Sequence, residues 1–304
     1  MYFDKENLYL LTQCAIAAAC KAGMHISRQV DRKLNVLTKQ GGDTLASQVV
    51  TEVDTESEQI VINTLSDSMK IYDIGMLTEE RPDDGSRLAK TAFWCIDPLD
   101  GTLPFIHKTH GYSVSIALVA QDGTPLIGVI YDPVKHILYY ATRGMGAFRN
   151  QDRFEFAKPE TNENHLYLFA DRGYKELPDY ENIIAKIKRE ISDSQYNQIE
   201  VNAIAGGAIN TCMVLEHAPS CYYKFPKRGN GGGSLWDYAA AACLFNEAGG
   251  IATDIYGHIL ELNRVESTYL NHKGVLFASD EKTAAMIRCV YQQRVAETGD
   301  NSLC

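Results

Sequence analysis

The chain has 304 residues, of which 45% are hydrophobic and 22% charged, a composition typical of a soluble globular protein and unlike a disordered or fibrous one. Its 29 lysines and arginines against 39 aspartates and glutamates give a net charge of −10, which argues against a dedicated nucleic-acid binder because backbone recognition needs a basic face. The length is one at which a single hydrophobic core begins to divide, so we expect one large domain or two closely packed halves.

The first half of the chain predicts helices packed on an antiparallel or mixed sheet. Apolar residues recur at helical spacing over residues 7–27, and a second helix is expected over residues 51–68. A short apolar strand at 91–96 is expected to end at the turn-forming pair Asp97-Pro98. Three further strands are expected at hairpin spacing, over residues 113–120, 125–131 and 136–142.

In the second half, strands and helices alternate. A polar stretch at residues 150–164 marks a boundary, which divides the chain into sub-domains of residues 1–155 and 156–304. Strands are expected at 165–170, 221–225 and 275–278, and helices at 183–191, 206–216, 236–248 and 281–293. Alternating layers of helix and sheet predict an α+β sandwich of two closely packed sub-domains.

Three acidic segments lie where a regular element is expected to begin or end. Glu79-Glu80 follow an apolar stretch, residues 97–102 follow the strand at 91–96, and Asp237 opens an alanine-rich helix. Each has a purely structural alternative: an exposed loop, a plain turn, and a capping box between Ser234 and Asp237, respectively. Their occurrence together in one chain favours chemistry over three unrelated structural roles.

The segment from Asp97 to Thr102 has the character of a cation and phosphate site. Pro98 fixes one backbone dihedral angle and Gly101 permits a sharp turn, so Asp97 and Asp100 can point into one small space. Like charges that close are costly unless a cation lies between them, and Mg²⁺ prefers carboxylate oxygens. Gly101 and Thr102 add backbone N–H groups and a hydroxyl that suit a phosphate.

These segments resemble the lithium-sensitive, magnesium-dependent phosphatases that include inositol monophosphatase and the 3′(2′),5′-bisphosphate nucleotidases. The likeness runs from about residue 8 to residue 292. The family pattern W-x-x-D-P-[IL]-D-G-T matches residues 94–102, and W-D-x-A-A…E-A-G-G matches residues 236–250. The family's acidic pair matches Glu79-Glu80, although Thr78 replaces the glycine that usually precedes it.

The resemblance implies a layered α-β-α-β-α sandwich that hydrolyses a phosphate monoester with metal-activated water and two or three Mg²⁺ ions. It implies five metal ligands: the side chains of Glu79, Asp97, Asp100 and Asp237, and the carbonyl group of Leu99. The backbone of Gly101 and Thr102 would hold the phosphate, and Asp237 would also contact the substrate.

A further match concerns the attacking water. Residues 50–54 fit the family segment V-T-x-x-D, which makes Asp54 the expected partner of the Thr102 hydroxyl in positioning that water. Glu79 is the competing candidate for the base. Alternatively, Asp54 is only an exposed residue in the first turn of a helix.

The substrate is expected to carry a second phosphate. Inositol monophosphatases have a glutamate on the strand before the W-D motif, and Lys224 occupies that position here, where a cation suits an anion better than a neutral hydroxyl. Alternatively, Lys224 belongs to a solvated loop. Gly206 and Gly207 would begin the helix that cradles the substrate, whereas Leu103 departs from the lysine usual in the nucleotidase branch.

The sequence therefore predicts a bisphosphate nucleotidase acting on 3′-phosphoadenosine 5′-phosphate, with an inositol-1-monophosphatase or a non-catalytic phosphate-ligand sensor as alternatives. The chain has eight cysteines without a CxxC pair, which indicates reduced thiols. Its apolar runs fall short of the roughly 18 residues that span a bilayer, and residues 1–5 lack the features of a signal peptide. We expect a cytoplasmic protein whose partner is a small phosphorylated substrate, without a membrane or nucleic-acid polymer. A homodimer is left open.

Overall fold

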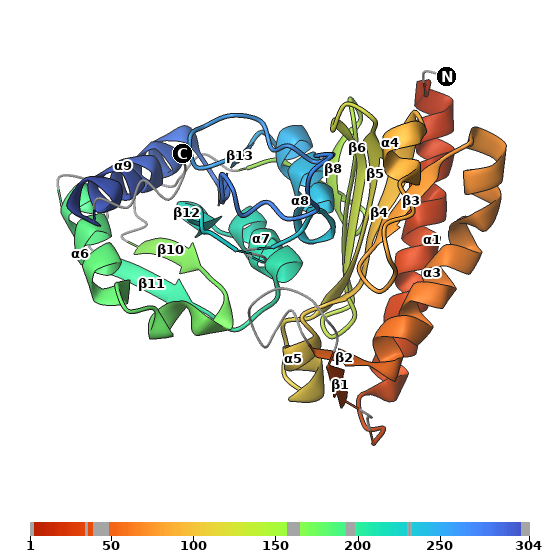
Figure 1. Ribbon diagram of the computed structural model, residues 1–304, viewed down its shortest axis with the longest axis horizontal. Coiled ribbons are helices and arrows are strands. Elements are labelled where there is room, and N and C mark those ends of the chain that lie inside the picture. Colours follow the sequence, from red (N-terminus) through yellow and green to blue (C-terminus); the bar gives the residue numbers. More distant parts are fainter. Residues whose placement is uncertain are drawn as a thin grey trace.

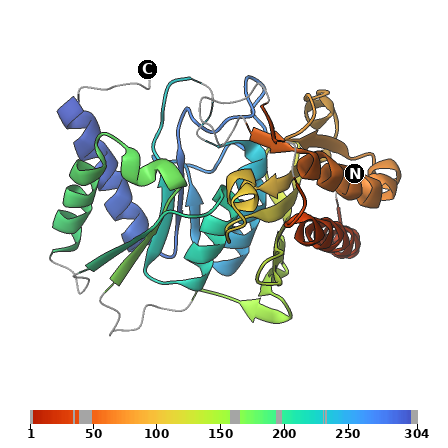
Figure 2. The ribbon, with the colours of Figure 1, turned by 90° about the horizontal axis from the view of Figure 1, so that it is seen from below.

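Two large β-sheets and three layers of helices alternate in the computed structural model, which also contains a small two-stranded sheet (Figure 1). The structure describes residues 3–33, 36–38, 49–156, 165–192, 198–229, 231 and 233–298. One helix pair covers the outer face of a seven-stranded sheet, a second lies between the sheets, and a third covers the outer face of a five-stranded sheet (Figure 2). These pairs are α1 (Lys5–Gln29) with α3 (Glu52–Tyr72), α7 (Gly207–Glu216) with α8 (Leu235–Ala248), and α6 (Tyr180–Ile191) with α9 (Glu281–Thr298). The expected α-β-α-β-α layering is confirmed.

The seven-stranded sheet follows chain order and contains the three expected hairpin strands. Its strands are β3 (Gly75–Thr78), β4 (Ala92–Asp100), β5 (Ser113–Ala120), β6 (Pro125–Asp132), β7 (Ile137–Thr142), β8 (Gly146–Arg149) and β9 (Asp152–Phe154). Only β3 and β4 pair in parallel among these neighbours, and the rest are antiparallel. Strands β4 to β6 are buried along almost their whole length because helices cover both faces.

Helix α8 packs closely on the inner face of this sheet. A side chain at Gly128 of β6 would place its Cβ atom 2.2 Å from the carbonyl oxygen of Ala240, so only glycine permits this approach. The hydroxyl of Ser115 on β5 donates to the carbonyl oxygen of Trp236 at 3.1 Å. Helix α8, which belongs to the second half of the chain, is thereby fixed against the strands of the first half.

The five-stranded sheet is mixed and has the order β11-β10-β12-β14-β13. Strands β10 (His165–Phe169), β11 (Gln198–Asn202) and β12 (Ser220–Lys224) are parallel, whereas β13 (Ile251–Thr253) and β14 (Val275–Ala278) join antiparallel. The seven-stranded sheet ends with β9 and the five-stranded sheet begins with β10, and the sub-domain boundary expected at residues 155 and 156 stays a prediction. Residues 157–164 lie outside the described part of the chain.

The strand expected at residues 91–96 does not stop at Asp97-Pro98 but continues as β4 to Asp100. Its pairing with β5 shifts register between Asp97 and Asp100, and this irregularity accommodates Pro98, which has no N–H group to donate. The sequence also failed to predict several short elements. These are β3, β8, β9, β11, β13, β1 (Val36–Thr38), β2 (Val49–Thr51), α4 (Ser86–Ala89), α5 (Thr102–Ile106) and the 3₁₀ helix η1 (Arg172–Glu176).

Within the described residues, no helix has both the length and the apolar character that crossing a bilayer requires.

Candidate active site

Three carboxylates from distant parts of the sequence meet between the two sheets. Asp97 and Asp100 come from the end of β4, and Asp237 comes from the first turn of α8. One oxygen of each lies within 4.8 Å of those of the other two. Asp97 and Asp100 are buried, and Asp237 is partly buried. We call this group the aspartate cluster.

Asp237 serves its helix and the aspartate cluster at once. Its Oδ2 atom accepts the backbone N–H of Ser234 at 2.8 Å, as one half of a capping box. The capping interpretation from the sequence is therefore correct, but it does not compete with a role in the site. The cap holds the carboxylate in a fixed orientation at the start of α8, where that helix meets β4.

Asp100 is held by the start of helix α7. Its two oxygens accept the N–H groups of Gly207 at 3.0 Å and Ala208 at 2.9 Å. The N–H of Gly206 donates to the carbonyl oxygen of Gly111 at 2.8 Å. The N–H groups of both glycines expected to cradle a substrate thus have acceptors within the protein, and their contact with substrate stays a prediction.

The charges in the aspartate cluster oppose one another. Burial raises the pKa of Asp100, and the charge of Asp237 raises it further. Burial also raises the pKa of Asp237, followed by the charge of Glu79. A divalent cation among the carboxylates would offset both the desolvation and the repulsion. The donor set therefore fits a hard cation such as Mg²⁺.

Two further expected ligands lie beside the aspartate cluster. Glu79 follows β3, and its N–H donates to the carbonyl oxygen of Ile96 at 3.2 Å, which places it next to the end of β4. Its side chain is not one of the three clustered carboxylates, although its charge reaches Asp237. The Leu99 carbonyl oxygen lies 3.4 Å from the Thr102 hydroxyl. Metal binding by Glu79 and Leu99 stays a prediction.

The contact expected between Thr102 and Asp54 is present. The Thr102 hydroxyl donates to Asp54 Oδ1 at 2.9 Å, while Asp54 Oδ2 accepts the Thr51 hydroxyl at 2.6 Å and the Thr51 N–H at 2.8 Å. Asp54 does lie in the first turn of α3, but it is 1% exposed, so the exposed-residue alternative is wrong. Burial raises its pKa to about 6, despite these hydrogen bonds.

Lys224 is paired with an acid that sequence reasoning missed. Its Nζ atom lies 2.6 Å from Asp171 Oδ2, and the hydroxyl of Tyr222 donates to Asp171 Oδ1 at 2.9 Å. Strands β10 and β12 are parallel with Phe169 opposite Tyr222, so the residues two positions later, Asp171 and Lys224, emerge at the same sheet edge. The position of Asp171 just after an expected strand was the available signal. Its charge also raises the pKa of Asp100 and of Asp237.

Comparison with known proteins identifies the family of the chain. The model of the inositol monophosphatase family matches residues 7–296. Inositol monophosphatase 2 of Rattus norvegicus is 28% identical over 275 residues, covering 89% of each chain. Inositol-1-monophosphatase of Bacillus subtilis is 29% identical over 241 residues, covering 78% of this chain and 82% of that one. The crystal structure of the extragenic suppressor protein suhB from Bartonella henselae superposes with a TM-score of 0.71 and 25% identity, over 92% of this chain and 98% of that one. The protein belongs to the inositol monophosphatase family and is a phosphomonoester hydrolase.

Proposed function

We propose that the protein hydrolyses its phosphate monoester with two or three Mg²⁺ ions held around the aspartate cluster. The convergence of Asp97, Asp100 and Asp237 within 4.8 Å carries this proposal. Carboxylates are the protein ligands that Mg²⁺ prefers, and substrate phosphate oxygens complete its coordination. Glu79 and the carbonyl oxygen of Leu99 would supply further ligands from the adjoining ends of β3 and β4. When bound, the ions would polarise the phosphate and lower the pKa of a water molecule.

The chain's own residues would position that water and take its proton. The Thr102 hydroxyl donates a hydrogen bond to Asp54, so the lone pairs of the hydroxyl oxygen stay available to accept a hydrogen bond from the water. Because its pKa is raised to about 6, Asp54 is basic enough to receive a proton through Thr102 near neutral pH. The N–H groups of Gly101 and Thr102, at the start of α5, would hold the phosphate.

We infer that the substrate carries one phosphate on a polyhydroxylated ring, as in inositol 1-phosphate. The Lys224–Asp171 pair supports this, because the carboxylate balances the charge that a second phosphate would need. Asp171 is 44% exposed, and its oxygens retain lone pairs that can accept hydrogen bonds from substrate hydroxyl groups. The names of the rat and Bacillus subtilis relatives support the same substrate class.

A bisphosphate nucleotide is the second candidate, favoured by the position of Lys224. The charge of this lysine lowers the pKa of Asp237, so a cation does lie near the aspartate cluster. A second phosphate that displaced Asp171 from Lys224 would find a positive partner there. The two candidates thus differ in whether Asp171 or a phosphate group neutralises Lys224.

Steady-state hydrolysis of inositol 1-phosphate and of 3′-phosphoadenosine 5′-phosphate separates these candidates. We expect the inositol ester to have the higher kcat/KM in the wild type. Asp171→Asn removes the balancing charge and should move the kcat/KM ratio toward the nucleotide by about tenfold. A wild-type preference for the nucleotide, with a ratio that Asp171→Asn leaves unchanged, would contradict the assignment.

The catalytic role of the aspartate cluster has its own test. Asp97→Asn should lower Mg²⁺-dependent phosphate release at least about 100-fold, because the substitution removes the charge of one metal ligand. The other carboxylates of the aspartate cluster stay in place. Asp122→Asn is the matched control, since Asp122 lies in an exposed turn, where it accepts the N–H of Thr124 at 2.9 Å. Equal activity of the two variants would remove Asp97 from the mechanism.

A further inference from the structure

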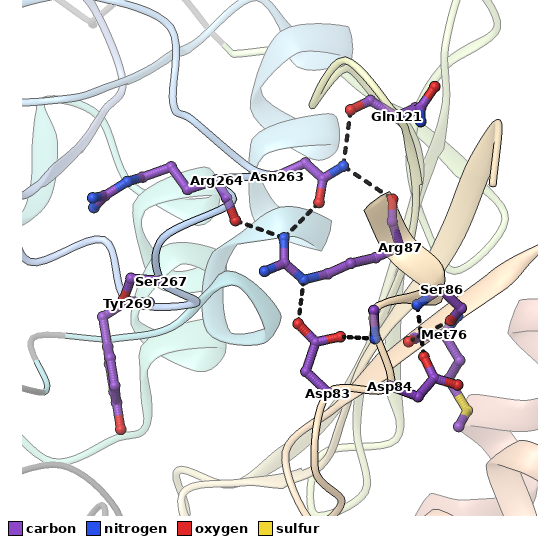
Figure 3. Close-up of polar contacts among 11 residues, drawn as sticks. Met76, Asp83, Asp84, Ser86, Arg87, Gln121, Asn263, Arg264, Ser267 and Tyr269 are labelled. Carbon is purple, nitrogen blue, oxygen red and sulfur yellow. Dashed lines mark hydrogen bonds and ion pairs between the residues drawn. The ribbon is translucent and has the colours of Figure 1, made fainter. Parts of the chain in front are cut away.

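Arg87 is a buried cation at the junction of the two halves of the chain. Its side chain is 2% exposed. Its Nε atom donates to Asp83 Oδ2 at 2.6 Å, and its Nη1 atom donates to Asn263 Oδ1 and to the carbonyl oxygen of Arg264, each at 2.7 Å (Figure 3). The Nδ2 atom of Asn263 in turn donates to the carbonyl oxygens of Arg87 at 3.1 Å and Gln121 at 2.8 Å. One guanidinium group thus ties α4 to a segment 176 residues away in sequence.

At one end of this connection lies the loop that begins with Glu79. Asp83, which binds the guanidinium group, also accepts the N–H of Gly85 at 2.9 Å. The hydroxyl of Ser86 accepts the N–H of Met76 on β3 at 3.0 Å, which closes the loop onto the strand that precedes Glu79. Arg87 therefore fixes the course of the chain between Glu79 and α4.

At the other end, the segment after Asn263 holds the start of helix α8. The N–H of Leu235 donates to the carbonyl oxygen of Thr268 at 2.9 Å, and the N–H of Leu270 donates to the carbonyl oxygen of Gly233 at 3.0 Å. Ser234, whose N–H binds the Asp237 carboxylate, forms an antiparallel bridge with Tyr269. The segment is thus attached to the turn of helix that presents Asp237.

We propose that Arg87 is a positioning residue that holds the Glu79 loop and the start of α8 at the separation that divalent cation binding requires. The inference rests on the proposed function, because it concerns the same metal site. Glu79 and Asp237 belong to different halves of the chain and repel each other, so binding of a shared ion needs a connection that resists their separation. Arginine suits this role because the rigid plane of its guanidinium group directs Nε to Asp83 and Nη1 to Asn263 and Arg264, whereas an ammonium group is a single point on a flexible stem.

The test compares Arg87→Met with Lys186→Met. Lys186 is also fully buried and pairs with a carboxylate, that of Glu297, but it joins α6 to α9 on the far side of the five-stranded sheet. Mg²⁺ affinity is measured by isothermal titration calorimetry, and the half-saturating Mg²⁺ concentration by phosphate release. Arg87→Met should lower the Mg²⁺ affinity and raise the half-saturating Mg²⁺ concentration, each by about tenfold or more. Its kcat at saturating Mg²⁺ should stay within about threefold of the wild-type value. Lys186→Met should lower the Tm but change neither Mg²⁺ value more than about twofold.

Asn263→Ala is the milder variant, because it leaves the guanidinium group bound to Asp83 and Arg264 and keeps the core intact. We expect it to weaken Mg²⁺ binding by about threefold to tenfold, and this result decides the matter if Arg87→Met does not fold. Unchanged Mg²⁺ affinity in a folded Arg87→Met or Asn263→Ala protein would overturn the inference alone. A wild type that binds no Mg²⁺ would overturn the proposed function and the inference with it.

Discussion

Gly206→Ala should disable the aspartate cluster without disturbing the fold. Gly206 precedes α7 with a φ of −69° and a ψ of 170°, a conformation that alanine adopts freely. The added Cβ atom would nevertheless lie 2.5 Å from Asp100 Oδ2 and 2.6 Å from Oδ1. The substitution therefore acts on the Asp100 carboxylate and not on backbone strain.

The size of the effect follows from these distances. Ordinary contact with a Cβ atom begins at 3.4 Å, so the carboxylate must retreat by about 0.9 Å. That shift breaks or stretches its hydrogen bonds to the N–H groups of Gly207 and Ala208. A misplacement of about 1 Å in a catalytic constellation costs about 100-fold in rate, equivalent to about 2.7 kcal/mol of transition-state stabilisation.

Phosphate release as a function of Mg²⁺ concentration measures this loss, and thermal unfolding shows whether the fold is retained. Gly173→Ala is the control, because no atom lies within 4 Å of the position its Cβ would take. We expect Gly206→Ala to lose about 100-fold in kcat/KM with a Tm near that of the wild type. A value within about threefold of the control would refute the reasoning.

Two other predictions concern stability. The first is measured in EDTA. Because the pKa of Asp54 is raised to about 6, the carboxyl group keeps its proton in the native state between about pH 4 and pH 6 but loses it in the unfolded state. The free energy of unfolding should therefore fall by up to about 3 kcal/mol as the pH rises through this window. Urea unfolding of Asp54→Asn should show a smaller fall in the free energy of unfolding over this pH range. A dependence of that free energy on pH equal to that of the wild type would contradict the prediction. Leu65→Ala, at a fully buried position of α3, should lower the free energy of unfolding by about 2–5 kcal/mol with kcat unchanged; a loss under about 1 kcal/mol would mean that α3 packs loosely.

Local patterns predicted most of the regular elements, and the missing ones have physical reasons. Strands β5, β6 and β7 were found because turn residues separate three apolar runs. The short strands β11 and β13 were missed because their residues are mostly half-exposed edge positions without a clear apolar pattern. Strand β4 was cut short because a proline normally ends a strand, whereas here the register shift accommodates Pro98.

The sequence predicted the site residues that lie in motifs, but it could not predict those that strand pairing or a distant partner brings into the site. Asp97, Asp100 and Asp237 stand at the ends of elements within long sequence patterns. Asp171 also follows an expected strand, but neither it nor Arg87 lies in a long sequence pattern. Their roles depend on the register of parallel strands and on a partner 176 residues away, respectively. The charge on Lys224 was visible from the sequence, but its neutralisation by Asp171 was not, and that changes the expected substrate.

Anomalous diffraction from Mn²⁺-soaked crystals of the wild-type protein tests the central claim most directly, since Mn²⁺ accepts the same oxygen ligands as Mg²⁺. The account predicts anomalous peaks among Asp97, Asp100 and Asp237, with at least one ion bonded to carboxylates from both β4 and α8. Anomalous peaks only elsewhere on the protein, with no ion within bonding distance of these three carboxylates, would contradict it.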